Sequence, residues 1–138
     1  MLDILTTDTI DPAWETLIGN GLNAFNDTVT GYADRHPLAI LARDDDGTVP
    51  GGALGRSSLG LLFLDLFYLP ASLRGGGIGR DILARFEAEG RHRGCRSAVL
   101  YTISFQAPEF YARHGWQRFG EIPCDPPGTS RVFMTKTL

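Results

Sequence analysis

The sequence is short of lysine, of cysteine and of long apolar runs. Lys136 is its one lysine, so the other 12 of its 13 basic residues are arginines. The formal net charge is −3, which excludes the strongly basic surface typical of proteins that bind nucleic acid or anionic membranes. No apolar run is long enough to span a bilayer. Cys95 and Cys124 match no metal-binding or redox spacing, so we expect reduced thiols and no metal site.

The composition is that of an ordinary globular protein. Of 138 residues, 43% are apolar and 21% are charged, and the mean hydropathy is −0.07, as in domains with a packed core. This length favours one domain over residues 1–138. The N-terminal residues lack the basic start and the apolar stretch of a secretion signal, so we expect a cytoplasmic protein.

Hydrophobic periodicity predicts alternating strands and helices. Asp11-Pro12 is a typical helix start, with an N-cap residue before a proline at the first helical position. The acids at positions 44–46 are adjacent, so they cannot converge on one calcium ion, and we expect a hairpin turn there. The expected elements are a strand over 2–6, a helix from residue 11, strands on both sides of the turn, a long buried strand over 59–69, a helix over 77–93, a strand over 97–103, a short helix over 107–115 and two closing strands.

Residues 75–79, Gly-Gly-Gly-Ile-Gly, lie between the buried strand and the long helix, with Arg74 and Arg80 on either side. Ordering glycine costs more backbone entropy than ordering any other residue, so a turn alone does not explain four glycines in five positions. A helix N-terminus presents unpaired N–H groups, and glycines let a phosphate approach them closely. Two nucleotide motifs are excluded. Arg80 and Ile82 occupy the positions open to the third glycine of a dinucleotide fingerprint, and a P-loop needs a lysine that is absent here.

Residues 74–79 match the pattern Arg-x-x-Gly-x-Gly and resemble the loop that binds the acetyl-CoA pyrophosphate in the GNAT superfamily of N-acetyltransferases. The segment "FQAPEFYARHGW" resembles the superfamily's second CoA-contacting element, and the resemblance covers roughly residues 20–138. It implies an acetyl-CoA-dependent N-acetyltransferase with an α/β (α+β) fold. The implied sheet is mixed and mostly antiparallel, has six to seven strands that splay at its centre, and is flanked by about four helices.

The resemblance also implies which residues bind the coenzyme. Backbone N–H groups of the glycine loop would surround the pyrophosphate, and the flanking arginines would add charge beside it. The main chain of the splayed strand would pair with the pantetheine amides, as in β-strand addition. The residues implied are Leu66, Phe67 and Leu69 on the strand, Arg74, Gly75, Gly76, Gly77, Ile78, Gly79 and Arg80 in the loop, and Gln106 and Phe110 in the second element.

Acetyl transfer to an amine needs a proton donor for the departing thiolate. Tyr111 matches the tyrosine that precedes a glycine-aromatic pair in the superfamily, so the resemblance makes it the donor. The alternative is a core tyrosine whose hydroxyl is satisfied within the fold.

The transfer also needs a base, because the acceptor amine is protonated at neutral pH. Asp65 is the one acid within the apolar strand, where burial would make its carboxylate a better proton acceptor. Alternation predicts its side chain on the same face as Phe63 and Phe67. The alternative is a carboxylate that only hydrogen-bonds a neighbouring loop. Glu121 and Asp125, near the closing strands, are weaker candidates for the base.

The candidates for the acceptor site are Asn26, Tyr68 and Ser104, with Tyr101 and Phe105 beside them. A helix cap for the asparagine and core packing for the aromatic residues are the alternatives. The acidic balance favours a cationic small molecule as acceptor, and a peptide amine fits as well. A non-catalytic acyl-CoA-binding module on the same scaffold is the alternative to an enzyme. We expect no nucleic-acid or membrane partner, and the resemblance implies a homodimer through the C-terminal strands.

Overall fold

The computed structural model describes residues 1–138, which form two compact units, 1–34 and 35–138. The single domain expected over 1–138 stays a prediction. No helix is long and apolar enough to cross a membrane, and no group of three or more histidine, cysteine or acidic residues could hold a metal ion.

The N-terminal unit contains one helix, α1 (Pro12–Thr30). The helix begins as predicted, because the Asp11 carboxylate accepts a hydrogen bond from the Ala13 N–H at 2.9 Å and Pro12 occupies the first turn. It ends at Gly31, which adopts the left-handed conformation with φ 85°. The strand expected over residues 2–6 is wrong, since these residues pair with no other strand.

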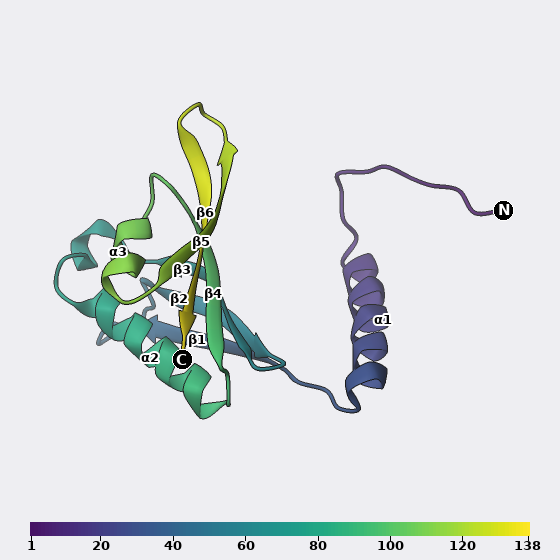
Figure 1. Ribbon diagram of the computed structural model, residues 1–138, viewed down its shortest axis with the longest axis horizontal. Helices are drawn as coiled ribbons and strands as arrows, with labels where there is room; N and C mark the ends of the chain where they lie inside the picture. The colour runs from purple at the N-terminus through teal and green to yellow at the C-terminus, as the bar shows by residue number, and fades with distance from the viewer. The chain divides into compact units, whose positions relative to one another are not determined.

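The C-terminal unit is a six-stranded mixed sheet in the order β1-β2-β3-β4-β6-β5. Only the β3–β4 pairing is parallel. Helix α2 packs against β1, β2 and β3, and α3 lies against β5 (Figure 1). The mostly antiparallel sheet is therefore confirmed, with three α-helices in the chain rather than about four. The elements are β1 (Arg35–Ala42), β2 (Gly51–Ser58), β3 (Leu61–Tyr68), the short 3₁₀ helix η1 (Ala71–Leu73), α2 (Ile78–His92), β4 (Ser97–Ile103), α3 (Pro108–Arg113), β5 (Gln117–Cys124) and β6 (Thr129–Thr137).

The parallel pair β3–β4 separates partway along its length. Its last paired residues are Phe63 and Val99, although β3 continues to Tyr68 and β4 to Ile103. The backbone groups of β3 beyond Phe63 therefore lack a partner on the β4 side. The splayed centre that the resemblance implied is confirmed.

A β-bulge at Asp65 changes which side chains of β3 point toward the core. Leu54 of β2 pairs with Leu66 and the next residue, Gly55, pairs with Leu64, so Asp65 is an extra residue without a counterpart. Such an insertion shifts the alternation of side chains by one position. The residues of β2 that pair with β3 before and after Asp65 show this change.

Before the bulge, Phe63 pairs in register with Arg56, whose guanidinium lies 4.1 Å above the Phe63 ring and also binds Asp65. After the bulge, Phe67 pairs with the fully buried Ala53 and packs against the core. Asp65 therefore shares a face with Phe63 but not with Phe67. The predicted common face of all three is wrong because of the bulge.

The core lies between the sheet and α2. The helix buries the apolar stripe Ile82, Leu83 and Phe86, as its periodicity predicts. It also buries Glu87, whose carboxylate accepts a hydrogen bond from Trp116 Nε1 at 3.1 Å. Lys136 Nζ lies 2.6 Å from the other oxygen of Glu87. This buried pair joins α2 to β6.

Candidate active site

A cleft of about 930 Å³ opens where β3 and β4 splay apart. The end of β3 forms one wall, and β4 with its following loop forms the other. The N-terminus of α2 and the helix α3 complete the lining. The cleft thus joins the glycine loop to the centre of the sheet, within the C-terminal unit.

The glycine loop enters α2 through residues that need glycine. Gly75 and Gly77 have φ values of 81° and 88°, the left-handed region that side chains rarely adopt. Gly77 is the N-cap of α2, and no side chain caps the helix there. A Cβ atom on Gly75 or Gly76 would meet nothing within 4 Å, so the backbone is open. Uncapped N–H groups at an open helix N-terminus suit an anion.

Arginines flank this loop in different ways. The Arg74 Nε donates a hydrogen bond to the carbonyl oxygen of Leu69 at 2.9 Å, which fixes its side chain against the end of β3. The Arg80 side chain is exposed, and its ion pair with Asp81 at 3.2 Å is also exposed. Exposed pairs of this kind are weak, so Arg80 can turn toward a bound anion at little cost.

Three aromatic rings pack together beside the cleft. Phe67 lies 6.0 Å from Phe110 and 6.5 Å from Tyr111, both edge to face. Tyr111 is only 7% exposed, and no hydrogen bond within the structure engages its hydroxyl. Burial raises the pKa of Tyr111 to about 12, because the low-dielectric surroundings disfavour the charged phenolate. The hydroxyl is therefore neutral and a hydrogen-bond donor at physiological pH.

Asp65 contributes the only carboxylate that lines the cleft. Its two oxygens each lie 2.8 Å from Arg56 Nη1. The side chain is 44% exposed, so the burial expected from its place in an apolar strand is wrong. Asp65 alternates with the buried Leu62 and Leu64, so its side chain lies with Arg56 on the face away from the core.

Most of the residues predicted for the coenzyme site line this one cleft. Gly76 and Ile78 do not line it. The Gln106 side chain is engaged locally, because its carbonyl oxygen accepts a hydrogen bond from the Ile103 N–H at 2.9 Å. The predicted coenzyme residues along the cleft are Leu66, Phe67, Leu69, Arg74, Gly75, Gly77, Gly79, Arg80, Gln106 and Phe110.

The acceptor candidates are not all brought together. Tyr68 is exposed and lines the cleft, as do Tyr101 and Phe105. Ser104 lies outside the cleft lining, where its Oγ accepts a hydrogen bond from the Ser130 N–H at 3.0 Å. Asn26 belongs to the N-terminal unit, within α1 rather than at its C-cap. Its role stays a prediction.

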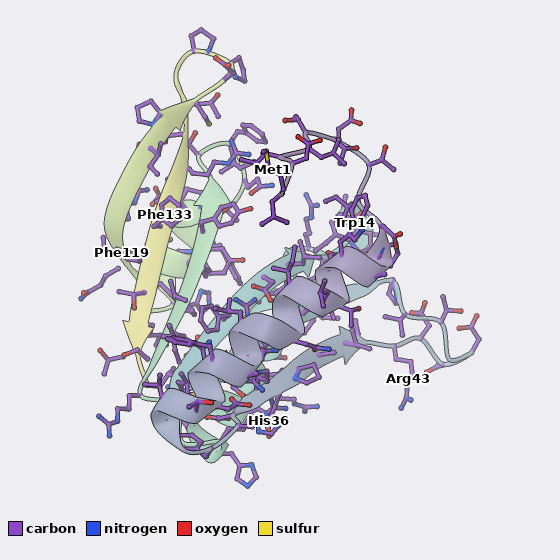
Figure 2. All side chains as sticks on the ribbon, turned by 90° about the vertical axis from the view of Figure 1, so that its right-hand side faces the viewer. Met1, Trp14, His36, Arg43, Phe119 and Phe133 are labelled. Carbon is purple, nitrogen blue, oxygen red and sulfur yellow. The ribbon has the colours of Figure 1, made fainter.

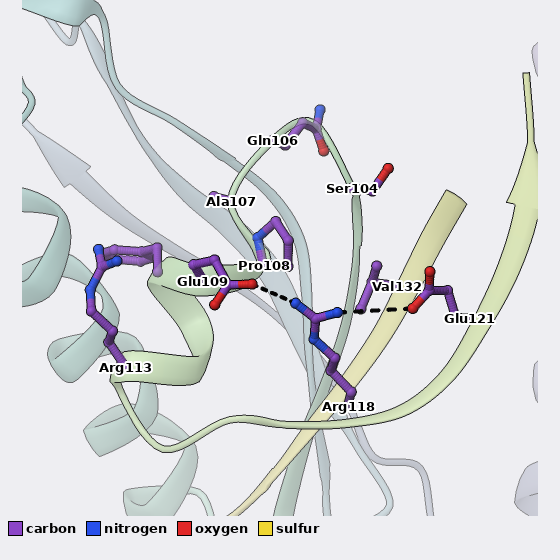
Figure 3. A pocket seen from close by; sticks show the side chains of 10 residues that line it. Ser104, Gln106, Ala107, Pro108, Glu109, Arg113, Arg118, Glu121 and Val132 are labelled. Carbon is purple, nitrogen blue, oxygen red and sulfur yellow. Dashed lines mark hydrogen bonds and ion pairs between the residues drawn. The ribbon is translucent and has the colours of Figure 1, made fainter. Parts of the chain in front are cut away.

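A smaller pocket of about 380 Å³ lies between α3 and β5 (Figure 3). Ser104 and Glu121 line it. Figure 3 shows Arg118 between two carboxylates, at 2.6 Å from Glu109 and 3.9 Å from Glu121. Glu121 also accepts a hydrogen bond from the Ser130 hydroxyl at 2.7 Å. Neither Glu121 nor Asp125 lines the larger cleft, so Asp65 is the better placed of the three acids.

Arg113, His114 and Arg131 line the cleft but were not predicted as site residues. Arg131 could have been found from the alternation of "RVFMTKTL", in which it shares a face with Phe133. Arg113 and His114 lie at the end of a short helix whose orientation no sequence pattern sets.

Comparison with known proteins agrees with this architecture. The model of the Acetyltransferase (GNAT) family matches residues 8–116. An acetyltransferase of Agrobacterium fabrum is 33% identical over 135 residues, which are 98% of each chain. Blasticidin-S acetyltransferase of Streptomyces morookaense is 34% identical over 113 residues, which are 79% of this chain and 83% of that protein.

Solved structures share the fold. The crystal structure of a protein from Agrobacterium tumefaciens, assigned as an acetyltransferase, superposes with a TM-score of 0.92 at 32% identity and covers 99% of this chain and 100% of that one. An aminoglycoside 6'-N-acetyltransferase, solved with coenzyme A, has the same fold at 19% identity, with a TM-score of 0.63 over 74% of this chain and 73% of its own. Cleft, topology and sequence agree, and the chain belongs to the GNAT acetyltransferase family of acetyl-transferring enzymes.

Proposed function

We propose that the protein transfers an acetyl group from acetyl-CoA to a primary amine of a small molecule or peptide, by direct attack in a ternary complex. The observation that carries the proposal is a single cleft that joins an open, uncapped helix N-terminus to Tyr111 and Asp65. Binding a nucleotide thioester needs an anion site for its phosphates and an extended channel for the rest of the molecule. The cleft contains both, next to each other.

The chain fits the coenzyme through its backbone. The glycine loop would bind the pyrophosphate with its N–H groups, because they carry the positive end of the α2 dipole. The unpaired edge of β3, from Leu64 to Tyr68, would pair with the pantetheine amides in place of the missing β4 contacts. Phe67 lies in that edge, and a backbone N–H near it would stabilise the oxyanion formed at the thioester.

The acceptor must lose a proton before it attacks. An alkyl amine with a pKa near 10.4 is almost fully protonated at pH 7, and supplying its free base costs roughly 4.6 kcal/mol. We assign proton removal to the Asp65 carboxylate, directly or through one water, because it is the only acid in the cleft lining. Arg56 would hold that carboxylate in position through its contacts to both oxygens.

Asp65→Asn should lower kcat by about 100-fold, the usual size of a lost general base. The loss should shrink as the pH rises toward the pKa of the amine, since less base catalysis is then needed. Steady-state kinetics from neutral pH up to the pKa of the amine measure this. Glu121→Gln is the matched control, because it removes a carboxylate outside the cleft. A larger loss of activity in Glu121→Gln than in Asp65→Asn would reverse the assignment.

Tyr111 would donate a hydrogen bond to the departing thiolate. Complete proton transfer from a hydroxyl with a pKa of about 12 to a thiolate of ordinary pKa near 8.5 is uphill by roughly 5 kcal/mol. A donor matched to the thiolate would have a pKa closer to that of the thiol than Tyr111 has. We therefore propose that Tyr111 stabilises the developing charge mainly as a hydrogen-bond donor.

Tyr111→Phe should lower kcat by about tenfold to 100-fold while leaving the KM for acetyl-CoA near its original value, because only the hydroxyl is lost. Release of free thiol, followed in an assay with acetyl-CoA and a panel of amines, measures the effect. Thr48→Val removes a hydroxyl from the turn between β1 and β2, which does not line the cleft, and serves as control. Tight CoA binding without thiol release in the unmodified protein would instead indicate a non-catalytic acyl-CoA-binding module. A cytoplasmic location and a homodimer through the closing strands stay predictions.

A further inference from the structure

The charged side chains along the cleft are divided between the two faces of the sheet. Arg74, Arg80 and Arg113 belong to the glycine loop, α2 and α3. Arg131 instead lies on β6, and Asp65 lies on the face of β3 that Arg56 covers. The arginines near the glycine loop are on the side where the phosphates of a coenzyme would bind. Arg131 needs another explanation.

The register of the sheet assigns Arg131 to the face opposite α2. Its neighbours Ser130 and Val132 are buried on the α2 side, so Arg131 and Phe133 alternate onto the other side. Phe133 contacts Tyr101 of β4, with ring centroids 5.6 Å apart. It also lies 6.2 Å from Phe119 of β5, and Figure 2 labels these two phenylalanines. Arg131 thus lies on the same face of the sheet as these aromatic side chains, the face directed away from α2.

Arg131 is half-buried and forms no ion pair or side-chain hydrogen bond in the structure. Of the other cleft arginines, Arg74 binds the Leu69 carbonyl oxygen and Arg80 pairs with Asp81. Arg113 has no partner either, but its side chain is exposed to water, unlike that of Arg131. Holding a guanidinium partly away from water without a partner is unfavourable. A planar, forked cation without a partner at the edge of a binding cleft matches a carboxylate or phosphate.

The local charge also bears on the acceptor. On this face Asp65 is balanced by Arg56, so Arg131 leaves a surplus positive charge. A purely cationic amine would be repelled there. An amine that also carries an anionic group could direct its nitrogen toward Asp65 and its negative group toward Arg131.

We infer that Arg131 binds an anionic group, a carboxylate or a phosphate, on the acceptor, so that the substrate class is amines carrying a negative charge. This inference rests on the proposed function, of which it specifies the acceptor. It revises the cationic acceptor favoured by overall composition, since the net charge of the chain does not describe the charge of one face.

Matched acceptors test the inference with the full chain. Phenylalanine, phenylalaninamide and phenethylamine differ in the carboxylate, and O-phosphoethanolamine and ethanolamine differ in the phosphate. The measured quantity is kcat/KM for each amine that carries an anionic group relative to its counterpart without that group, in the unmodified protein and in Arg131→Gln. Arg131→Gln should reduce this ratio by about tenfold or more, through KM rather than kcat, because charge-assisted hydrogen bonds are lost.

The controls separate this role from a structural one. The KM for acetyl-CoA should stay unchanged in Arg131→Gln, and the kcat/KM for phenethylamine should rise rather than fall, because the repulsion of a purely cationic amine is removed. Arg131→Lys should restore part of the preference, and more of it for phosphate than for carboxylate, because lysine keeps the charge but lacks the fork. Turnover without a preference for either anionic amine, or an equal loss for all amines in Arg131→Gln, overturns the inference alone. Absence of turnover with every amine overturns the proposed function, and the inference with it.

Discussion

Gly77→Glu should abolish measurable acetyl-CoA binding while the C-terminal unit remains folded. Gly77 is the N-cap of α2 and has a φ of 88°. A side chain there strains the backbone by about 1–2 kcal/mol, and a Cβ would lie 2.8 Å from the Arg80 guanidinium. The added carboxylate would also occupy the helix N-terminus that the pyrophosphate needs. Loss of several charge-assisted hydrogen bonds predicts a Kd raised by more than about 1,000-fold.

A matched substitution separates binding from strain. Gly94 has a φ of 83°, and a Cβ added to it would meet nothing within 4 Å. It lies just beyond the opposite end of α2. Gly94→Glu therefore introduces the same backbone strain and the same charge away from the cleft. Titration calorimetry should find ordinary acetyl-CoA affinity in Gly94→Glu and none in Gly77→Glu, with similar circular dichroism spectra. Equal affinity in the two variants would rule out the glycine loop as the pyrophosphate site.

Lys136→Met should lower the free energy of unfolding by about 3 kcal/mol, the lower end of the effect of breaking a buried ion pair, because the more exposed Arg91 remains 3.7 Å from the Glu87 carboxylate. The Glu87 side chain is only 5% exposed, and Lys136 Nζ is 2.6 Å from it. The same ammonium donates a hydrogen bond to the carbonyl oxygen of His114 at 2.8 Å, so it also holds the end of α3 against β6. Urea denaturation followed by tryptophan fluorescence measures the change.

The double variant Glu87→Gln/Lys136→Met should be more stable than Lys136→Met alone, because no buried charge is left without a partner. Its glutamine oxygen can still accept the hydrogen bond from Trp116. Arg118→Met is the control, since its pair with Glu109 is exposed and should contribute less than about 1 kcal/mol. If Lys136→Met were no more destabilising than Arg118→Met, the buried pair would not be a major source of stability.

Much of the fold follows from local patterns. The start of α1 at Asp11-Pro12, the apolar stripe of α2 and the span of β4 over 97–103 are visible in the residues themselves. The glycine loop can also be located from the sequence, because a turn alone does not explain four glycines in five positions between a strand and a helix. These features depend on neighbours in sequence, which is why periodicity and capping rules find them.

The features that sequence did not predict depend on register between strands. Asp65 and Phe67 lie on opposite faces because of a bulge whose presence shows only when β2 and β3 are aligned. Its pairing with Arg56 joins residues nine positions apart across a hairpin. Glu87 and Lys136 are further apart in the sequence, so no local pattern around Glu87 indicates that Lys136 is its partner. The strand predicted over residues 2–6 is wrong for a related reason, because an apolar run becomes a strand only where another strand pairs with its backbone groups.

The extra residue in β3 has a consequence for how two reactants can meet. In a regular strand, positions 65 and 67 would point the same way and would compete for one space. Here Asp65 and Phe67 point to opposite sides of the sheet. Under the proposed function the acyl donor and its acceptor would arrive through separate entrances, with the strand itself as the partition between them.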